Sequence, residues 1–152
     1  MSIGVKALTD TIASHLASLG VFERVNQHEP KNAPGNGLSC AVWVNSIDPV
    51  PAHSGLRSTS GRVAFMARIY GSMLQEPQDA IDSTMVEAVD LSMTALSADF
   101  ELGGNAAYID LLGATGMTLS AKAGYLNQDG KLFRVMDIVI PVVINDLWEQ
   151  VR

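Results

Sequence analysis

Residues 119–145, LSAKAGYLNQDGKLFRVMDIVIPVVIN, decide the fold of this chain. Two β-prone runs meet at Asp129-Gly130. Asp-Gly between such runs is a strong hairpin signal, because a type I′ turn needs positive φ at both central positions. The stretch therefore predicts two antiparallel strands joined by a two-residue turn.

The second of these strands is apolar on both faces. Its residues form two alternating sets, Ile138, Ile140, Val142 and Ile144 on one side and Val139, Pro141 and Val143 on the other. A strand in a sheet with one wet face is apolar on one side only. Either both faces are covered within the fold, or one meets a partner. Because Pro141 cannot donate within a central ladder, we expect this strand to be a sheet edge or to be broken there.

Composition indicates one globular domain, residues 1–152, with no visible boundary. Hydrophobic residues make up 47% and charged residues 17%, and the net charge of −6 argues against a general nucleic-acid binder. The lone cysteine, Cys40, excludes an internal disulfide and a multi-cysteine metal site. The N-terminus lacks the pattern of a signal peptide, and no apolar run is long enough to span a bilayer. We therefore expect a protein that folds in a cytoplasm.

Hydrophobic periodicity predicts the other elements. Helices are expected from Val5 to Leu19, and from Pro77 to about Leu96; strands are expected over 21–28, 38–47, 62–71 and 107–112. Residues 48–61, rich in proline and glycine, read as a long loop. The order is α-βββ-α-βββ. It predicts an α+β domain, a mainly antiparallel sheet of about six strands with two helices packed on one face.

The residues that carry chemistry form no catalytic or metal-binding pattern. His15, His28 and His53 fall in different predicted elements and lack ligand spacing. Cys40 lies in mid-strand and reads as a small buried hydrophobe. The nucleophile elbow of serine hydrolases and the complete phosphate-binding loop do not occur. Neither a metal nor a cofactor is therefore expected, and the acidic pairs on the second helix read as a solvated face.

Three arginines on predicted strands need an explanation. Arg62 and Arg68 share one face of the third strand, and Arg134 stands on an otherwise apolar face of the last strand. An arginine among apolar strand positions needs a carboxylate or carbonyl partner. That partner belongs either to the same chain or to a neighbouring subunit, and the sequence leaves both open.

Five stretches together carry a resemblance to a known family. They are HLASLGVFERVNQHEP (15–30), AVWVNSIDPVP (41–51), SGRVAFMARIYGSML (60–74), EPQDAIDSTMVEAVD (76–90) and GYLNQDGKLFRVMDIVIPVVINDLW (124–148). In element order and texture the chain resembles the tail terminator proteins of long-tailed bacteriophages, the minor tail protein family of the lambda-like type. The resemblance covers nearly the whole chain but includes no invariant catalytic motif.

The resemblance implies a structural virion protein that is not an enzyme. Members form a ring, typically of six copies, which caps the growing tail tube, ends its polymerisation and offers a surface for head joining. The implied partners are other copies of the chain, the tail tube protein and the head-completion or neck proteins. DNA would pass through the lumen without specific binding, and a chain with few lysines and arginines suits that passage. The implied location is the head-proximal end of the virion tail, after assembly in the host cytoplasm and without a membrane.

A closed ring needs two different patches of each subunit to meet. We expect the interface to draw on the loop 48–61 and on strand residues, namely His53, Arg57, Arg62, Arg68, Arg134, Ile138, Ile140, Val142 and Ile144. Residues 138–144 should lie against a helix on one side and near a neighbouring subunit on the other.

Two other functions stay open from the residues alone. One is a head-closure or neck connector of the same head–tail interface. The other is a small α+β enzyme or ligand-binding domain built from His53, Arg68 and Tyr70. A deep pocket with perturbed titratable groups would favour the enzyme. Open sheet edges and complementary patches would favour the ring.

Overall fold

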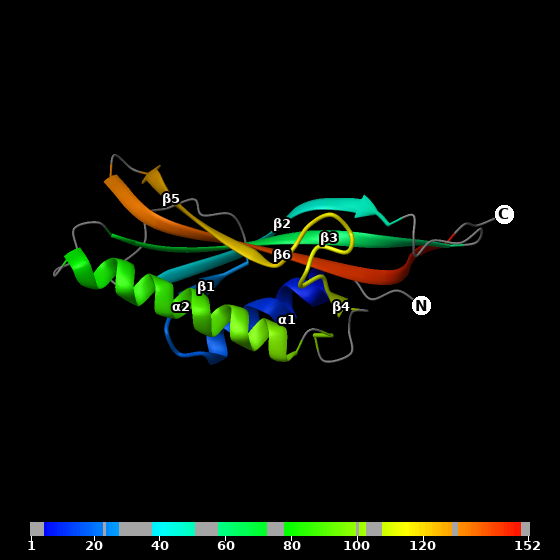
Figure 1. The fold of residues 1–152 in the computed structure, drawn as a ribbon, viewed down its shortest axis with the longest axis horizontal. Helices are drawn as coiled ribbons and strands as arrows, with labels where there is room; N and C mark the ends of the chain where they lie inside the picture. The colour runs from blue at the N-terminus through cyan, green and yellow to red at the C-terminus, as the bar shows by residue number, and fades with distance from the viewer. Residues whose placement is uncertain are drawn as a thin grey trace.

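The computed structural model describes residues 5–22, 24–27, 38–50, 58–72, 78–99, 101–102, 108–128 and 131–149. Their elements are α1 (Val5–Ser18), β1 (Arg24–Asn26), β2 (Ser39–Pro49), β3 (Ser58–Ser72), α2 (Gln78–Ala98), β4 (Tyr108–Ile109), β5 (Ser120–Gln128) and β6 (Lys131–Glu149). The predicted order α-βββ-α-βββ and the α+β class are confirmed. Figure 1 shows both helices on the same side of the sheet.

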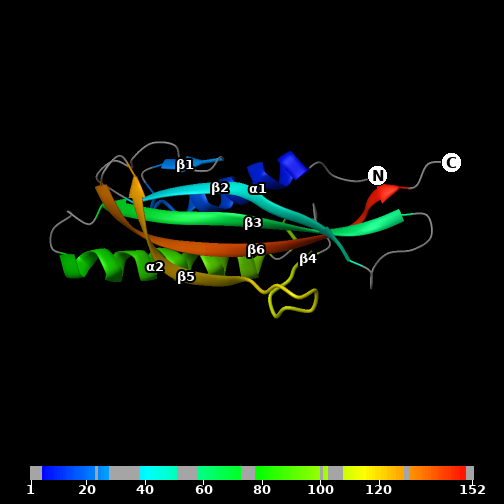
Figure 2. The same cartoon turned by 90° about the horizontal axis from the view of Figure 1, so that it is seen from above.

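The sheet has the strand order β1-β2-β3-β6-β4, and β5 also pairs with β6. Every pairing is antiparallel except that of β1 with β2, which is parallel. The predicted first strand is therefore shorter than expected and does not form a hairpin with the second. Figure 2, seen from above the sheet, shows β2, β3 and β6 running side by side along the molecule.

The predicted hairpin is confirmed. Gln128 pairs with Lys131 across β5 and β6, which leaves a connection of two residues. Those two, Asp129 and Gly130, lie outside the described residues, so the type of turn stays a prediction. The last strand is longer than the sequence indicated, since β6 continues to Glu149.

The expectation that Pro141 marks a sheet edge is wrong, because β6 is an interior strand, but the alternative expectation of a break at Pro141 is met on one side of the strand. β6 pairs with β3 along one side and with β5 and then β4 along the other. Pairing with β5 ends at Val139, and pairing with β4 begins at Val142. The carbonyl of Pro141 accepts a hydrogen bond from Asp110 N at 2.8 Å on that same side. A residue's N–H points to the same side as its carbonyl, so the missing donor falls where one partner strand replaces the other.

The long loop predicted over 48–61 is strand at both of its ends. β2 runs to Pro49 and β3 begins at Ser58, and Val50 N donates to Ser60 O at 2.8 Å. The pairing of β3 with β2 and β6 extends both strands through residues whose own preferences are for turns, since tertiary context overrides such preferences. The register of β2 against β3 shifts between Val44 and Ser46, so the pairing is irregular at that point. Only residues 51–57 of that predicted loop lie outside the described ranges.

The core lies between the helices and the sheet. Its members come from the apolar stripes of both helices and from alternate residues of β2, β3 and β6, the largest fully buried among them being Phe65, Leu8, Ile12, Leu16, Ile69, Met85, Leu96, Ile138 and Ile140. The helix stripes predicted from the sequence are thus buried as expected. Cys40 is a buried core residue, as predicted, and burial raises the pKa of its thiol to about 12. A thiol in that state is a poor nucleophile.

The first helix ends as its sequence indicates. Gly20 has a φ of 71° and donates its N–H to the carbonyl of Ala17, closing the last turn. Within the described ranges, neither helix combines the length and apolar character needed to cross a bilayer.

Candidate functional site

The sheet face opposite the helices is the candidate functional surface, called the outer face below (Figure 1). Its register aligns side chains of β2, β3, β6 and β5 in rows across the sheet. One row joins Ser39, Tyr70, Val135 and Gly124, the next Ala41, Arg68, Asp137 and Lys122, and a third Trp43, Met66, Val139 and Ser120. No helix of the described chain lies over these rows (Figures 1 and 2).

A small apolar cluster occupies the outer face. Ala41, Tyr70 and Val135 are buried there, and Trp43 packs against them half-buried. This second cluster is separate from the main core on the helix side. The cluster gives β2, β3 and β6 a second, smaller set of apolar contacts on this face.

Arg68 finds its partner within the fold. Its Nε donates to Asp137 Oδ1 at 2.7 Å and its Nη2 to Asp137 Oδ2 at 3.2 Å. The guanidinium carbon also lies 5.5 Å from the centroid of the Trp43 ring, within the range of a cation–π contact. The question that the sequence left open is therefore answered for Arg68. The interaction joins β2, β3 and β6 across the outer face.

We expect the pair of Arg68 and Asp137 to show a coupling free energy of about 1 kcal/mol, because it has two hydrogen bonds and is only part-buried. A double-mutant cycle of Arg68→Ala and Asp137→Ala in urea unfolding measures it. The control is a second cycle, of Arg68→Ala with Lys122→Ala. Lys122 is an exposed side chain in the same row, and this cycle should give no coupling free energy with Arg68. Equal coupling in the two cycles would contradict the assignment.

Arg62 holds a loop against the same face. Its Nη1 donates to the carbonyl of Thr115 and its Nη2 to Asp48 Oδ2 at 3.3 Å. Arg62 pairs with Val143 in the sheet register, so the loop 110–119 lies over this end of the outer face. Val143 and Pro141 are buried there. The expectation that the second side of residues 138–144 is left for a neighbouring subunit is thus wrong for these two residues, and only Val139 remains part-exposed.

Asp110 organises the loop that Arg62 holds. Its carboxylate accepts hydrogen bonds from the backbone N–H groups of Gly113, Ala114 and Thr115, at 2.9, 2.9 and 2.7 Å, and from Thr115 Oγ1 at 2.5 Å. Burial alone would raise the pKa of Asp110, but these hydrogen bonds favour the charged form and lower it. The pKa of Tyr108 is raised by burial and by the nearby Asp110 charge.

Sequence analysis missed the part played by Asp110. The available signal was an aspartate three residues before Gly113, since aspartate side chains bond the backbone of a following turn. The sequence placed Asp110 in the strand expected over 107–112. The tip of the loop carries Leu112, which is 95% exposed.

Arg134 stacks on an aromatic ring of the adjacent strand. Its guanidinium carbon lies 4.7 Å from the centroid of Tyr125, an exposed residue that pairs with it across the hairpin. Arg134 lies on the opposite side of β6 from the outer face. The three arginines therefore do not form one patch.

The four apolar residues predicted for an interface lie in the core. Ile138, Ile140, Val142 and Ile144 are between 0% and 4% exposed and pack among the helix-side core residues. Their burial leaves no surface for a neighbour, so the interface expectation is wrong for these side chains, while their expected position against a helix is correct. His53 and Arg57 lie outside the described residues. An interface role for Arg62, Arg68 and Arg134 stays a prediction.

The described residues line two open hollows on the surface. One, of about 340 Å³, follows α1 and is lined by Asp10, Thr11, Ser14, His15 and Ser18. Beside it His15 Nε2 lies 2.8 Å from Asp99 Oδ2, which ties the end of α1 to the end of α2. The other, of about 360 Å³, lies at the β2 edge between Val5, Lys6, Thr9, Gln27, Trp43 and Val44.

Among the residues that the structure describes, no three histidine, cysteine or carboxylate side chains gather to hold a metal ion. Of the residues considered for an enzyme site, Arg68 is paired with Asp137 and Tyr70 is buried in the outer-face cluster.

Comparison with known proteins gives similarity to two solved assemblies. No family model matches the chain, and no curated protein matches it. A chain of the virion of a native gene transfer agent particle is 14% identical, with a TM-score of 0.41, and the match covers 94% of this chain and 98% of that one. A chain of the sheath/tube terminator of an extracellular contractile injection system, in its extended state, is 11% identical with a TM-score of 0.39, covering 96% of this chain and 58% of that one. Both scores lie below 0.5, so neither match assigns a function here.

Proposed function

We propose that the chain is a non-enzymatic structural virion protein, a tail terminator that forms a ring on the head-proximal end of the tail tube. The observation that carries the proposal is a sheet with open edges on opposite sides. In the described part of the chain, the edge of β2 that faces away from β3 pairs only with β1, over Ser39–Ala41. At the other edge of the sheet, β5 pairs only with β6 among the described strands. A subunit with two different open edges is suited to head-to-tail contacts, which close into a ring when the rotation allows.

The sequence supports the same function independently. The resemblance to tail terminators extends over five stretches between residues 15 and 148. Two arginines of the outer face are paired inside the chain, Arg68 with Asp137 and Arg62 with Asp48. Covering these pairs with another protein would not leave either arginine without a carboxylate. In the proposed assembly the ring has six copies, its partners are the tube protein and the neck proteins, and DNA passes through the lumen.

Deletion of the gene, followed by electron microscopy of the lysate, tests the proposal. We expect tails of uncontrolled length that are not joined to filled heads, because the last tube ring would keep recruiting tube subunits. Supplying the wild-type chain from a plasmid should restore tails of one length. Tails of normal length in the deletion lysate would overturn the proposal, and if those tails also failed to join heads, the result would support a neck connector.

A further inference from the structure

The loop that carries Leu112 is held in place by a set of hydrogen bonds. Apart from the Asp110 hydrogen bonds, Gly116 N donates to Gly113 O at 3.0 Å, Leu119 N to Asp110 O at 3.0 Å, and Thr118 Oγ1 to Leu111 O at 2.7 Å. Arg62 holds the far side of the same loop through the carbonyl of Thr115. A leucine that is 95% exposed on a loop fixed in this way loses little conformational entropy on binding. It has the properties of an anchor residue at a protein interface.

The hollow at the β2 edge has the properties of a receiving site. It forms where β1 ends, because β1 pairs with β2 only as far as Ala41. Val5, Trp43 and Val44 give it apolar walls, and Lys6, Thr9 and Gln27 give it polar ones. Its volume of about 360 Å³ leaves room for an aliphatic side chain.

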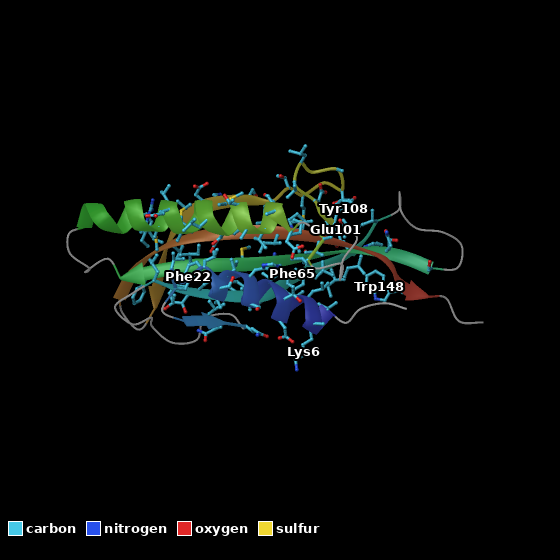
Figure 3. The ribbon with its side chains drawn as sticks, turned by 90° about the horizontal axis from the view of Figure 1, so that it is seen from below. Lys6, Phe22, Phe65, Glu101, Tyr108 and Trp148 are labelled. Carbon is cyan, nitrogen blue, oxygen red and sulfur yellow. The ribbon has the colours of Figure 1, made fainter. Side chains whose placement is uncertain are left out.

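The anchor and the hollow lie at the same level of the sheet but on opposite edges. Met66 of β3 pairs with Trp43 on one side and with Val139 on the other. Pro141, the next β6 residue on that face, accepts the hydrogen bond from Asp110. Figure 3 shows Lys6 at one margin of the molecule and Tyr108 with Glu101 at the other. Leu112 of a chain is thus placed away from that chain's own hollow and on the side where a neighbour would sit.

The charges on the two margins are complementary. Lys6 is an exposed residue that lines the hollow, and Glu101 is exposed near Tyr108, the strand residue from which the anchor loop departs. Two copies placed side by side bring these opposite charges onto facing margins. This complementarity favours a second copy of the chain over other occupants.

We propose that Leu112 of one copy inserts into the hollow formed by Val5, Thr9, Trp43 and Val44 of the next copy. The inference rests on the proposed ring and specifies its subunit contact. The two patches differ, so each copy offers one anchor and one hollow and the contact repeats around the ring. Lys6 and Glu101 set the orientation of neighbours at the margin of this contact.

Disulfide trapping in assembled tails tests the contact directly. The deletion strain is supplied with a chain carrying Leu112→Cys and Thr9→Cys, and purified tails are oxidised mildly and run on a denaturing gel. The only native cysteine, Cys40, is buried and does not interfere. We expect a ladder of covalent oligomers that extends beyond the dimer, whereas a symmetric contact would stop at the dimer. The control chain carries Leu112→Cys and Val86→Cys, the latter on an exposed position of α2, and should give no ladder.

A charge series separates this contact from the function on which it rests. Leu112→Glu should lower the yield of head-joined tails at least tenfold without changing the unfolding midpoint of the purified chain, while Val86→Glu should change neither. Lys6→Glu and Glu101→Lys should each reduce the yield, and the double variant should recover it.

A normal tail length with no ladder and no effect of Leu112→Glu overturns the contact while the terminator function stands. A loss of tails with Leu112→Glu but no ladder overturns it as well, because the anchor would then bind another protein. If the cysteine variant gives a ladder but deletion of the gene leaves tail length normal, the contact is supported and the terminator function is overturned.

Discussion

Replacing Ile140 by alanine should lower the free energy of unfolding of the isolated chain by about 2–5 kcal/mol. Ile140 is fully buried in the centre of β6, the strand to which β3, β4 and β5 all pair. Truncation there removes apolar contacts from the core between the helices and the sheet, and the surrounding strands cannot close the cavity without losing register. Urea unfolding of the purified chain, followed by circular dichroism, measures the change.

The matched control is the same substitution at Ile47, which is 45% exposed on β2. Ile47→Ala should cost about 1 kcal/mol or less, because the side chain already meets water and loses mainly strand preference. The comparison also distinguishes a core residue from an interface residue. If Ile140→Ala left the isolated chain as stable as Ile47→Ala does but prevented assembly, the core assignment of Ile140 would be wrong.

Replacing Asp110 by alanine should destabilise the chain by about 2–3 kcal/mol at neutral pH, because three backbone N–H groups and the Thr115 hydroxyl lose their acceptor. Part of the loop is exposed, so water replaces some of these bonds and limits the loss. Asp110→Asn keeps one acceptor oxygen and should show an intermediate loss. Thermal unfolding of the three chains at pH 7 provides the ranking.

The same carboxylate should make stability depend on pH. Its pKa in the folded chain lies below the ordinary value of 3.8, so the unfolded chain takes up the proton first as the pH falls. The stabilisation from Asp110 is therefore complete above about pH 5 and is lost as the pH falls from there through the folded pKa. The difference in stability between the wild-type chain and Asp110→Asn should shrink over that range. A difference that stays constant between pH 7 and pH 3 would show that the carboxylate charge is not what holds the loop.

The sequence predicted the elements whose signals are local. Helix periodicity identified the stripes of α1 and α2, and Asp129-Gly130 located the β5–β6 hairpin. The apolar residues of β6 correctly indicated that one face of this strand lies against a helix. These features depend on residues close together in the chain, and sequence reasoning reads such features well.

Features that depend on distant partners were not predicted. Pro141 indicated either a sheet edge or a break, and only the topology shows that it lies in an interior strand at the point where β5 gives way to β4. The partners of Arg62 and Arg68 are Asp48, Thr115 and Asp137, which only the sheet register brings near. Leu112 carried no sequence signal because its exposure results from the turn that Asp110 fixes. Residue type alone did not distinguish the core isoleucines from interface residues.

The central position of β6 also governs how the chain folds. β3 pairs with β6 from Ser58 with Glu149 to Ser72 with Phe133, so α2, β4 and β5 must be looped out before the two strands meet. Pairing between such distant residues makes folding slow, while the hairpin with β5 forms early from neighbouring residues. During synthesis the strand that unites the sheet is made after every other described element. Until β6 emerges from the ribosome, β3 has an unpaired apolar edge, and a chain interrupted before Lys131 would be left with that aggregation-prone edge.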